Sequence, residues 1–163
     1  MSKIAHKIVT RFDMEAKYSP DAKTRNIRPA TAADDTTIRR MVRAARLDPT
    51  SLHWRNFLVA EQDGKLIGVG QIKPHPGCQE LGSLVVLPAY RGQGVADALI
   101  AGLEVRAGRP LYLFCQDNMT AYYGRFGYQL IRYWDAPWFL KLKMLIPLAF
   151  RLFGVRIVIM RKD

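Results

Sequence analysis

The chain of 163 residues has the length of one ordinary domain, since a domain usually takes roughly 100 to 200 residues. Hydrophobic residues make up 49% and charged residues 24%, a balance that excludes a mainly disordered, collagen-like or coiled-coil chain. The 25 Lys and Arg against 14 Asp and Glu give a net charge of +11. This charge favours an anionic partner: a phosphorylated cofactor, an acidic substrate, nucleic acid or a membrane surface.

Several features indicate the cytoplasm. The charge-free run 81–90 is much shorter than the roughly 20 apolar residues that cross a bilayer, which argues against a transmembrane helix. The N-terminus lacks an apolar core and carries Asp13 and Glu15, which argues against a secretory signal. Cys78 and Cys115 fit neither a disulfide framework nor a metal-ligand spacing, so we interpret both as structural or incidental thiols in a reducing compartment and expect no metal.

The first half of the chain predicts a strand, a helix and a hairpin. Residues 1–25 show no clear pattern, and we interpret them as an N-terminal extension ahead of a domain at 26–163. A strand at 26–30 is followed by Thr31 and Asp34, a helix-start signature. The remaining signals are listed in chain order: a strand at 57–60, a turn at 63–65, a strand at 66–72, and Pro74 and Pro76, which are expected to end that strand.

The second half predicts strand-helix-strand units. The run 81–87 is nearly all apolar, as in a strand that is covered on both faces, and so belongs in the middle of a sheet. The later elements are listed in chain order: a helix from 95 to Gly108, a strand at 111–115, a short helix at 118–126, a strand at 128–133 and a last strand at 155–160. We therefore predict an α+β fold, a single domain with a mixed central sheet flanked by helices.

A glycine turn from Arg91 to Gly94 follows the apolar strand and opens the next helix. Glycines let the backbone turn tightly, so that unpaired N–H groups and the helix dipole converge on a phosphate. The sequence matches neither the glycine pattern of dinucleotide folds nor that of nucleotide hydrolases. A different phosphate ligand is indicated.

The segment Arg91-x-x-Gly94-x-Ala96 after Leu84-Val85-Val86-x-Pro88 resembles the coenzyme A pyrophosphate loop of the GNAT (GCN5-related) N-acetyltransferase superfamily. The element order over residues 26–134 also fits that family. A second motif, Tyr122-Tyr123-Gly124-Arg125-Phe126-Gly127-Tyr128, resembles the family's aromatic-Tyr-x-x-x-Gly-aromatic segment. With Asp48-Pro49-Thr50 before the hairpin, the pattern looks closest to small bacterial members similar to N-acetylglutamate synthase.

The resemblance implies a sheet whose middle strands splay apart and hold the pantetheine arm of acetyl-CoA like a missing strand. It also implies backbone contacts to pantetheine or the acetyl group at one strand end, and to the pyrophosphate at the glycine turn. The implied cofactor-binding residues are Val85, Val86, Arg91, Gly92, Gln93, Gly94, Val95, Ala96 and Asn118. The family's Asn position, seven residues before the Tyr, holds Gln116 here; Asn118 is either the cofactor contact or a helix N-cap.

The resemblance implies two catalytic residues. Tyr123 would be the general acid for the departing thiolate, and the alternative is an aromatic core residue. Glu80, which precedes the apolar strand, would be the general base, acting directly or through water; the alternatives are a solvated charge and deprotonation by bulk water. We interpret His53 and His75 as surface or loop residues, and the alternative is that their segments border the acceptor. We assign no nucleophilic role to Cys115.

An apolar and basic insert at 137–154 precedes the last strand, where the family normally turns back quickly. We favour packing on the sheet or a pocket wall for this insert. Two alternatives stay open: a homodimer contact, and contact of residues 138–153 with an anionic membrane.

These features predict a cytoplasmic N-acetyltransferase that moves an acetyl group directly from acetyl-CoA to a small-molecule amine, such as an amino acid. The alternatives are a non-catalytic coenzyme A-binding regulatory protein, and a lysine or N-terminal acetyltransferase that acts on proteins. We expect no nucleic-acid partner, because the basic residues are not interleaved with a surface pattern of aromatic residues.

Overall fold

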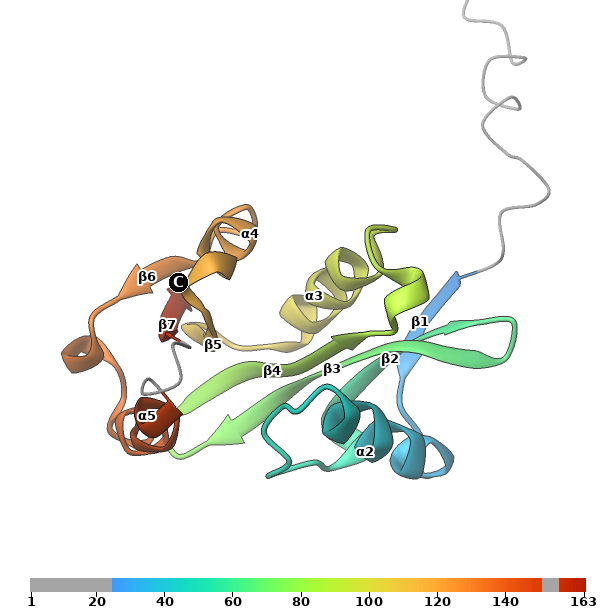
Figure 1. Cartoon of the computed structure of the whole chain (residues 1–163), viewed down its shortest axis with the longest axis horizontal. Coiled ribbons are helices and arrows are strands. Elements are labelled where there is room, and N and C mark those ends of the chain that lie inside the picture. The colour runs from blue at the N-terminus through green and yellow to red at the C-terminus, as the bar shows by residue number, and fades with distance from the viewer. Residues whose placement is uncertain (1–24, 151–155) are drawn as a thin grey trace, which may run out of the picture.

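The computed structural model describes residues 25–150 and 156–163, with side chains for 25–145 and 156–163. All of the predicted N-terminal extension except Arg25 lies outside the described residues. Within these described ranges, seven strands form one sheet in the order β1-β2-β3-β4-β5-β7-β6 (Figure 1). The strands are β1 (Arg25–Pro29), β2 (Phe57–Gln62), β3 (Lys65–His75), β4 (Cys78–Val86), β5 (Leu111–Gln116), β6 (Gln129–Ile131) and β7 (Ile157–Lys162).

Helices cover both faces of the sheet. They are α2 (Asp35–Ala44), α3 (Val95–Arg106), α4 (Thr120–Gly124) and α5 (Trp138–Phe150). In Figure 1, α3 and α4 lie on one face, while α2 and α5 lie on the other. Among the described side chains, the core accordingly divides into one cluster under α3 and two smaller ones, one under α2 and one under α5. The predicted α+β fold with a mixed sheet flanked by helices is confirmed.

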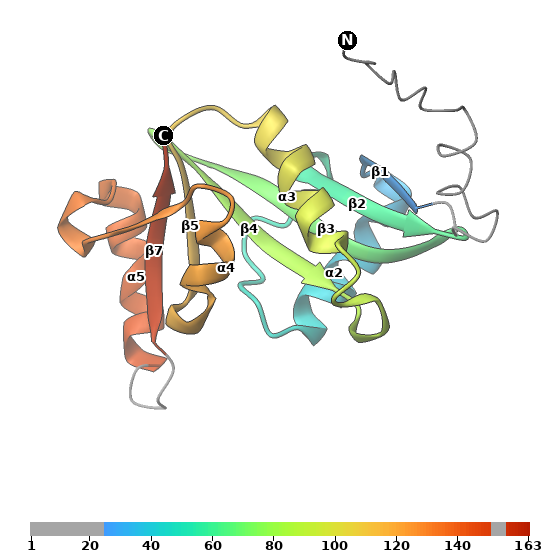
Figure 2. The same cartoon turned by 90° about the horizontal axis from the view of Figure 1, so that it is seen from above.

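The sheet forks between β4 and β5. These two strands run parallel and pair over three residues only, from Gln79–Leu111 to Leu81–Leu113, whereas the other neighbouring strands described run antiparallel. Beyond the last pair, β4 and β5 leave their common corner in different directions (Figure 2). The backbone groups on the facing edges of the two strands are therefore available to a ligand that lies between them.

A β-bulge in β4 lies just beyond the fork. Val69 pairs with Val85 and Gln71 with Gly82, so two residues of β4 face one of β3. One of them, Ser83, has a φ of +50°, and its hydroxyl accepts a 2.9 Å hydrogen bond from the Gln71 amide. A non-glycine residue in this region costs roughly 1–2 kcal/mol, and bulges of this kind re-aim backbone and side chains next to functional sites.

The start of the first helix follows the predicted signature. Thr31 and Asp34 flank a short 3-10 turn ahead of α2, and the Asp34 carboxylate accepts hydrogen bonds from both the backbone N–H and the hydroxyl of Thr31. One strand end differs from the prediction. β3 continues through Pro74 to His75. Its pairing with β2 ends at Gln71, so the edge that faces β2 needs no N–H donor beyond that residue, and proline, which has none, is tolerated there.

Helix α5 forms most of the insert and packs on the sheet. Leu140 is fully buried against Tyr112 of β5 and Ile159 of β7, as the favoured packing role requires. Trp138, Leu142 and Leu145 are exposed on its outer side, so the dimer and membrane alternatives stay predictions. Within the described residues, no helix has the length and apolar character to cross a membrane.

Candidate functional site

The glycine turn connects the end of β4 to the start of α3. Gly92 and Gly94 have φ of +72° and +74°, a region that other residues rarely adopt. Among the described residues, no heavy atom lies within 4 Å of the position that a Cβ would take at either glycine, so this part of the chain leaves open space at the turn. The first N–H groups of α3, from Val95 on, have no partner inside the helix, and no side chain caps them at Gly94. The turn can accept a phosphate group.

Two arginines hold this turn. Arg25, the first residue of β1, donates a 2.7 Å hydrogen bond from Nη1 to the carbonyl oxygen of Gln93 and reaches the Gln93 side chain with Nη2. Arg91 donates from Nε to the carbonyl oxygen of Val86 at 3.2 Å. Both guanidinium groups keep other donors and add positive charge beside the open turn, which suits the pyrophosphate of coenzyme A.

Acetyl-CoA fits the residues that surround the fork. The facing edges of β4 and β5 give a pantetheine arm backbone partners, and the free N–H groups at α3 give a pyrophosphate its donors. Val85 and Val86 lie at the end of the unpaired edge of β4. Asn118 lies in a 3-10 turn, Asp117–Met119, and is exposed. The interpretation of Asn118 as a helix N-cap is wrong, because Gln116 precedes this turn and Met119 precedes α4.

Tyr123 lies on α4, on the face of the sheet that α3 covers. Its ring contacts the Tyr122 and Tyr128 rings edge to face, with centroids 5.1 and 6.2 Å away. Burial, with a smaller effect from Cys115, raises the pKa of Tyr123 to about 12. The hydroxyl is therefore protonated at neutral pH and can donate a proton.

Asp97 connects α4 to the first turn of α3. Its carboxylate accepts hydrogen bonds from the Tyr122 hydroxyl at 2.8 Å and from Arg125 at 3.1 Å. These bonds hold the helix that carries Tyr123 close to the helix that opens at the glycine turn. Tyr122 is thus a structural residue, which explains why two consecutive tyrosines occur at this point.

Glu80 lies on the opposite face, at the fork, with a side chain only 5% exposed. Its Oε2 lies 2.8 Å from His75 Nε2, and both of its oxygens accept hydrogen bonds from Lys143 Nζ, at 2.9 and 2.7 Å. Burial opposes its ionisation, but the hydrogen bond with His75 and the charge of Lys143 outweigh burial and lower the pKa of Glu80. The carboxylate is ionised at neutral pH and can accept a proton only when its partners leave an oxygen free.

Two lysines and Asp48 complete this charged cluster between α2 and α5. Asp48 Oδ2 lies 2.9 Å from Lys73 Nζ and 3.0 Å from Lys143 Nζ. Lys73 is fully buried and also donates to the carbonyl oxygen of Thr50. Burial opposes the charge on Lys143, but Glu80 and Asp48 outweigh it and raise the pKa of Lys143.

His75 is not the surface residue that the sequence suggested. Its side chain is 6% exposed, and its ring stacks on Phe139 of α5 with centroids 4.7 Å apart. The interpretation is wrong because the insert covers a position that would be exposed in a chain without α5. Cys115, by contrast, is buried against the Met160 sulfur at 3.7 Å, and burial, with the charge of Asp117, raises its pKa to about 11. A thiol in this state is a poor nucleophile.

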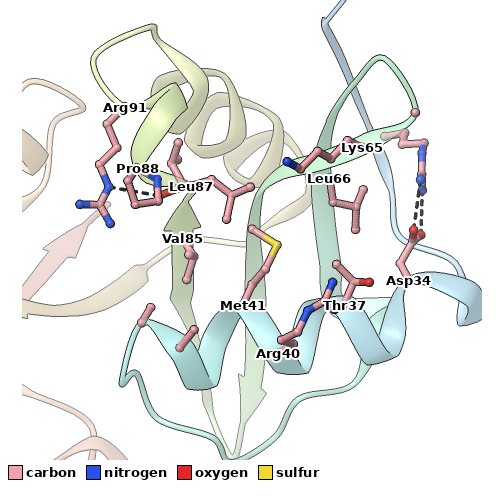
Figure 3. A pocket seen from close by; sticks show the side chains of 15 residues that line it. Asp34, Thr37, Arg40, Met41, Lys65, Leu66, Val85, Leu87, Pro88 and Arg91 are labelled. Carbon is pink, nitrogen blue, oxygen red and sulfur yellow. Dashed lines mark hydrogen bonds and ion pairs between the residues drawn. The ribbon is translucent and has the colours of Figure 1, made fainter.

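A cavity of about 680 Å³ lies beside the glycine turn on the α2 face of the sheet. In Figure 3 the apolar side chains of Met41 and Leu66 lie between the basic side chains of Arg40, Lys65 and Arg91. The cavity also borders Val85 and Val86. Its basic side chains therefore add to the positive electrostatic potential around the predicted phosphate site. Among the residues with described side chains, no group of three metal-ligand types is placed to hold a metal ion.

No site role was predicted for Arg25, Asp48, Lys73 or Lys143. Arg25 belongs to the predicted extension, and its contact with Gln93 spans 68 positions, which no local pattern reveals. Lys73 alone had a usable sequence signal: it directly follows the apolar run that ends at Ile72, and a buried lysine in a strand needs a carboxylate partner.

The mixed sheet forks between two parallel strands, and a glycine turn that can accept a phosphate lies at the end of one of them. This arrangement fits the class of coenzyme A-dependent acyltransferases that the motifs resemble. Residues 53–130 match the family model of the acetyltransferase (GNAT) domain. This matching segment, just under half of the chain, is similar to the GNAT acetyltransferase domain. No curated protein matches the chain in sequence.

Solved structures share the fold. N-acetylglutamate synthase from Neisseria gonorrhoeae, complexed with coenzyme A and N-acetyl-glutamate, superposes with a TM-score of 0.70 at 20% identity; the match covers 85% of this chain but only 35% of that one. This chain therefore spans about a third of that relative. A GNAT family acetyltransferase from Brucella melitensis, in complex with acetyl-CoA, is 28% identical with a TM-score of 0.52, over 66% of this chain and 84% of that one. Rv2747 from Mycobacterium tuberculosis, in complex with CoA, is 18% identical with a TM-score of 0.65, over 84% and 98% of the two chains.

Proposed function

We propose that this protein transfers the acetyl group of acetyl-CoA to a primary amine of a small molecule in one direct step. The observation that supports this most strongly is the fork between β4 and β5, which ends at a glycine turn with open helix N–H groups. Acetyl-CoA supplies the reactive thioester and its thiolate leaving group. Backbone groups of Val85 and Val86 hold its arm, and the turn from Arg91 to Ala96 holds the pyrophosphate.

Two side chains on opposite faces of the sheet carry out the proton transfers of the reaction. Glu80, on the face of α2 and α5, accepts a proton from the incoming amine. Tyr123, on the face of α3 and α4, donates a proton to the departing thiolate. The gap between β4 and β5 joins the two faces, so the amine approaches from one side of the sheet and the thiolate is protonated from the other.

The deciding experiment measures free thiol release from acetyl-CoA in the presence of a panel of primary amines. The proposal expects turnover with at least one amine, and about a 100-fold lower kcat/KM in Glu80→Gln with unchanged acetyl-CoA affinity. Glu61→Gln is the matched control, because Glu61 is an ion-paired carboxylate of β2 that bonds Arg28. An acetyl-CoA complex that acetylates none of the panel, or a Glu80→Gln variant with wild-type rates, contradicts the proposal.

One observation favours a second function, coenzyme A binding without transfer. The candidate base Glu80 is ion-paired to Lys143 and hydrogen-bonded to His75, so its oxygens are occupied. Such a protein would bind acetyl-CoA and release no thiol with any amine. The same assay therefore separates the two functions.

A further inference from the structure

The ammonium group of Lys143 lies in a site built by three other side chains. Its Nζ is 2.7 Å from Oε2 of Glu80 and 3.0 Å from Oδ2 of Asp48. The centre of the Phe114 ring lies 5.5 Å from the same Nζ, within the range of a cation–π contact. Two carboxylates and an aromatic ring are the groups that recognise a primary ammonium.

This ammonium site lies at the fork of the sheet. Leu113 forms the last pair between β5 and β4, and Phe114 is the next residue along β5. Glu80 belongs to the last paired segment of β4. The bound nitrogen is therefore next to the point where the gap between the strands begins, on the face from which the amine approaches.

The two lysines of the cluster differ in access. Lys73 is 1% exposed and is fixed by Asp48 and the carbonyl oxygen of Thr50, as a structural lysine would be. The Lys143 side chain is 20% exposed and Asp48 is 35% exposed, so the site opens to solvent on that side. Lys143 has four rotatable side-chain bonds and can leave the site while α5 stays packed.

We propose that Glu80, Asp48 and Phe114 form the binding site for the acceptor's ammonium group, and that Lys143 occupies this site until an acceptor displaces it. The proposal rests on the proposed function, because Glu80 has to contact the nitrogen that it deprotonates. Lys143 then lowers the apparent affinity for the amine by the fraction of time that it fills the site.

The occupant also indicates the chemical class of the acceptor. The nitrogen of Lys143 is carried by an unbranched CH2 group, and the site accommodates that geometry. An α-amino acid would place its carboxylate two bonds from the nitrogen, close to the negative charges of Glu80 and Asp48. The acceptor is therefore a primary alkylamine without a carboxylate on the carbon that bears the nitrogen.

Two substitutions of Lys143 with opposite expected effects on the KM for propylamine test the proposal. Lys143→Met leaves His75 bonded to Glu80 and should lower the KM for propylamine about tenfold, with an unchanged dissociation constant for acetyl-CoA. Lys143→Arg should raise the same KM, because a guanidinium binds a carboxylate with two parallel hydrogen bonds and leaves less readily. Lys141→Met, on the same helix, is the charge-matched control and should keep the wild-type KM.

A purely structural ion pair predicts a different pattern. In that case Lys143→Met would lose thermal stability while the KM for propylamine stayed constant or rose, and this result would overturn the proposal. A second measurement avoids dependence on turnover: Lys143→Ala should be stabilised against heat by millimolar propylammonium, which replaces the missing side-chain atoms, whereas Lys141→Ala should not respond.

The two proposals fail in distinguishable ways. If acetyl-CoA binds but no protein variant acetylates any amine, the proposed transferase function fails. A different result would contradict only the ammonium site: the wild type acetylates amines, Lys143→Met does not lower their KM, and propylammonium does not raise the thermal stability of Lys143→Ala. The transferase function would then stand. A wild-type enzyme that prefers glutamate or alanine to propylamine would also overturn the assigned acceptor class.

Discussion

Arg25 and Gln93 are 68 positions apart, yet the Arg25 guanidinium donates to the Gln93 carbonyl oxygen at 2.7 Å and fastens the glycine turn to the first strand. The bond holds the turn in one conformation before a ligand arrives, which reduces the ordering cost of binding. The turn and β1 thus form one unit although the chain between them contains three strands and a helix.

We expect Arg25→Ala to raise the dissociation constant for acetyl-CoA about fivefold, because the turn loses both a fixing contact and a nearby positive charge. Titration calorimetry with acetyl-CoA measures this. Arg43→Ala removes the same charge from the exposed side of α2 and should leave the affinity unchanged. Equal losses in both variants would mean that net charge alone, rather than the contact with Gln93, determines the effect.

Gly94 gives a second prediction about the same turn. Gly94→Ala forces a side chain into φ near +74°, and Gly77→Ala does the same at +75° in the turn between β3 and β4; both Cβ positions are open. Each variant should lose about 1 kcal/mol of unfolding free energy, measured by urea titration. Only Gly94→Ala should also bind acetyl-CoA more weakly, by at least about tenfold, because its Cβ occupies space at the glycine turn, where we expect the pyrophosphate to bind. Unchanged affinity in Gly94→Ala would place the phosphate elsewhere.

Much of the fold was predictable because its signals are local. The Asp63-Gly64 turn between two apolar runs, the apolar strand before Arg91 and the pair Thr31 and Asp34 each specify their element within a few residues. The charged cluster at the fork was not predictable. Lys143 and Glu80 are 63 positions apart, and only the packing of α5 on the sheet brings them together. The β-bulge at Ser83 could not be predicted either, because a serine gives no sequence signal for a positive φ.

The tyrosine pair on α4 supplies a matched comparison. Tyr123→Phe removes the hydroxyl assigned to protonate the thiolate and should lower kcat about 100-fold while acetyl-CoA affinity stays constant. Tyr122→Phe removes the hydrogen bond to Asp97 and should cost about 1 kcal/mol of stability with little change in kcat. Steady-state kinetics and thermal unfolding of both variants check this. Wild-type turnover in Tyr123→Phe would remove this residue from the reaction.

The Asp34 carboxylate should make stability depend on acid pH. The hydrogen bond from Arg28, assisted by Thr31 and opposed by burial, lowers the pKa of Asp34 from 3.8 to about 2. Because the folded state holds this proton less tightly than the unfolded state, the stabilisation is complete above pH 3.8 and is lost as the pH falls toward 2.

Asp34→Asn should therefore lose about 2 kcal/mol of unfolding free energy at pH 7, and its difference from the wild type should shrink between pH 4 and pH 2. Urea titrations across this range measure the difference. Asp35→Asn is the control, since Asp35 forms only a half-exposed pair with Arg39 and should cost well under 1 kcal/mol. A difference for Asp34→Asn that stays constant down to pH 2 would mean that the packing of this side chain, and not its charge, stabilises the start of α2.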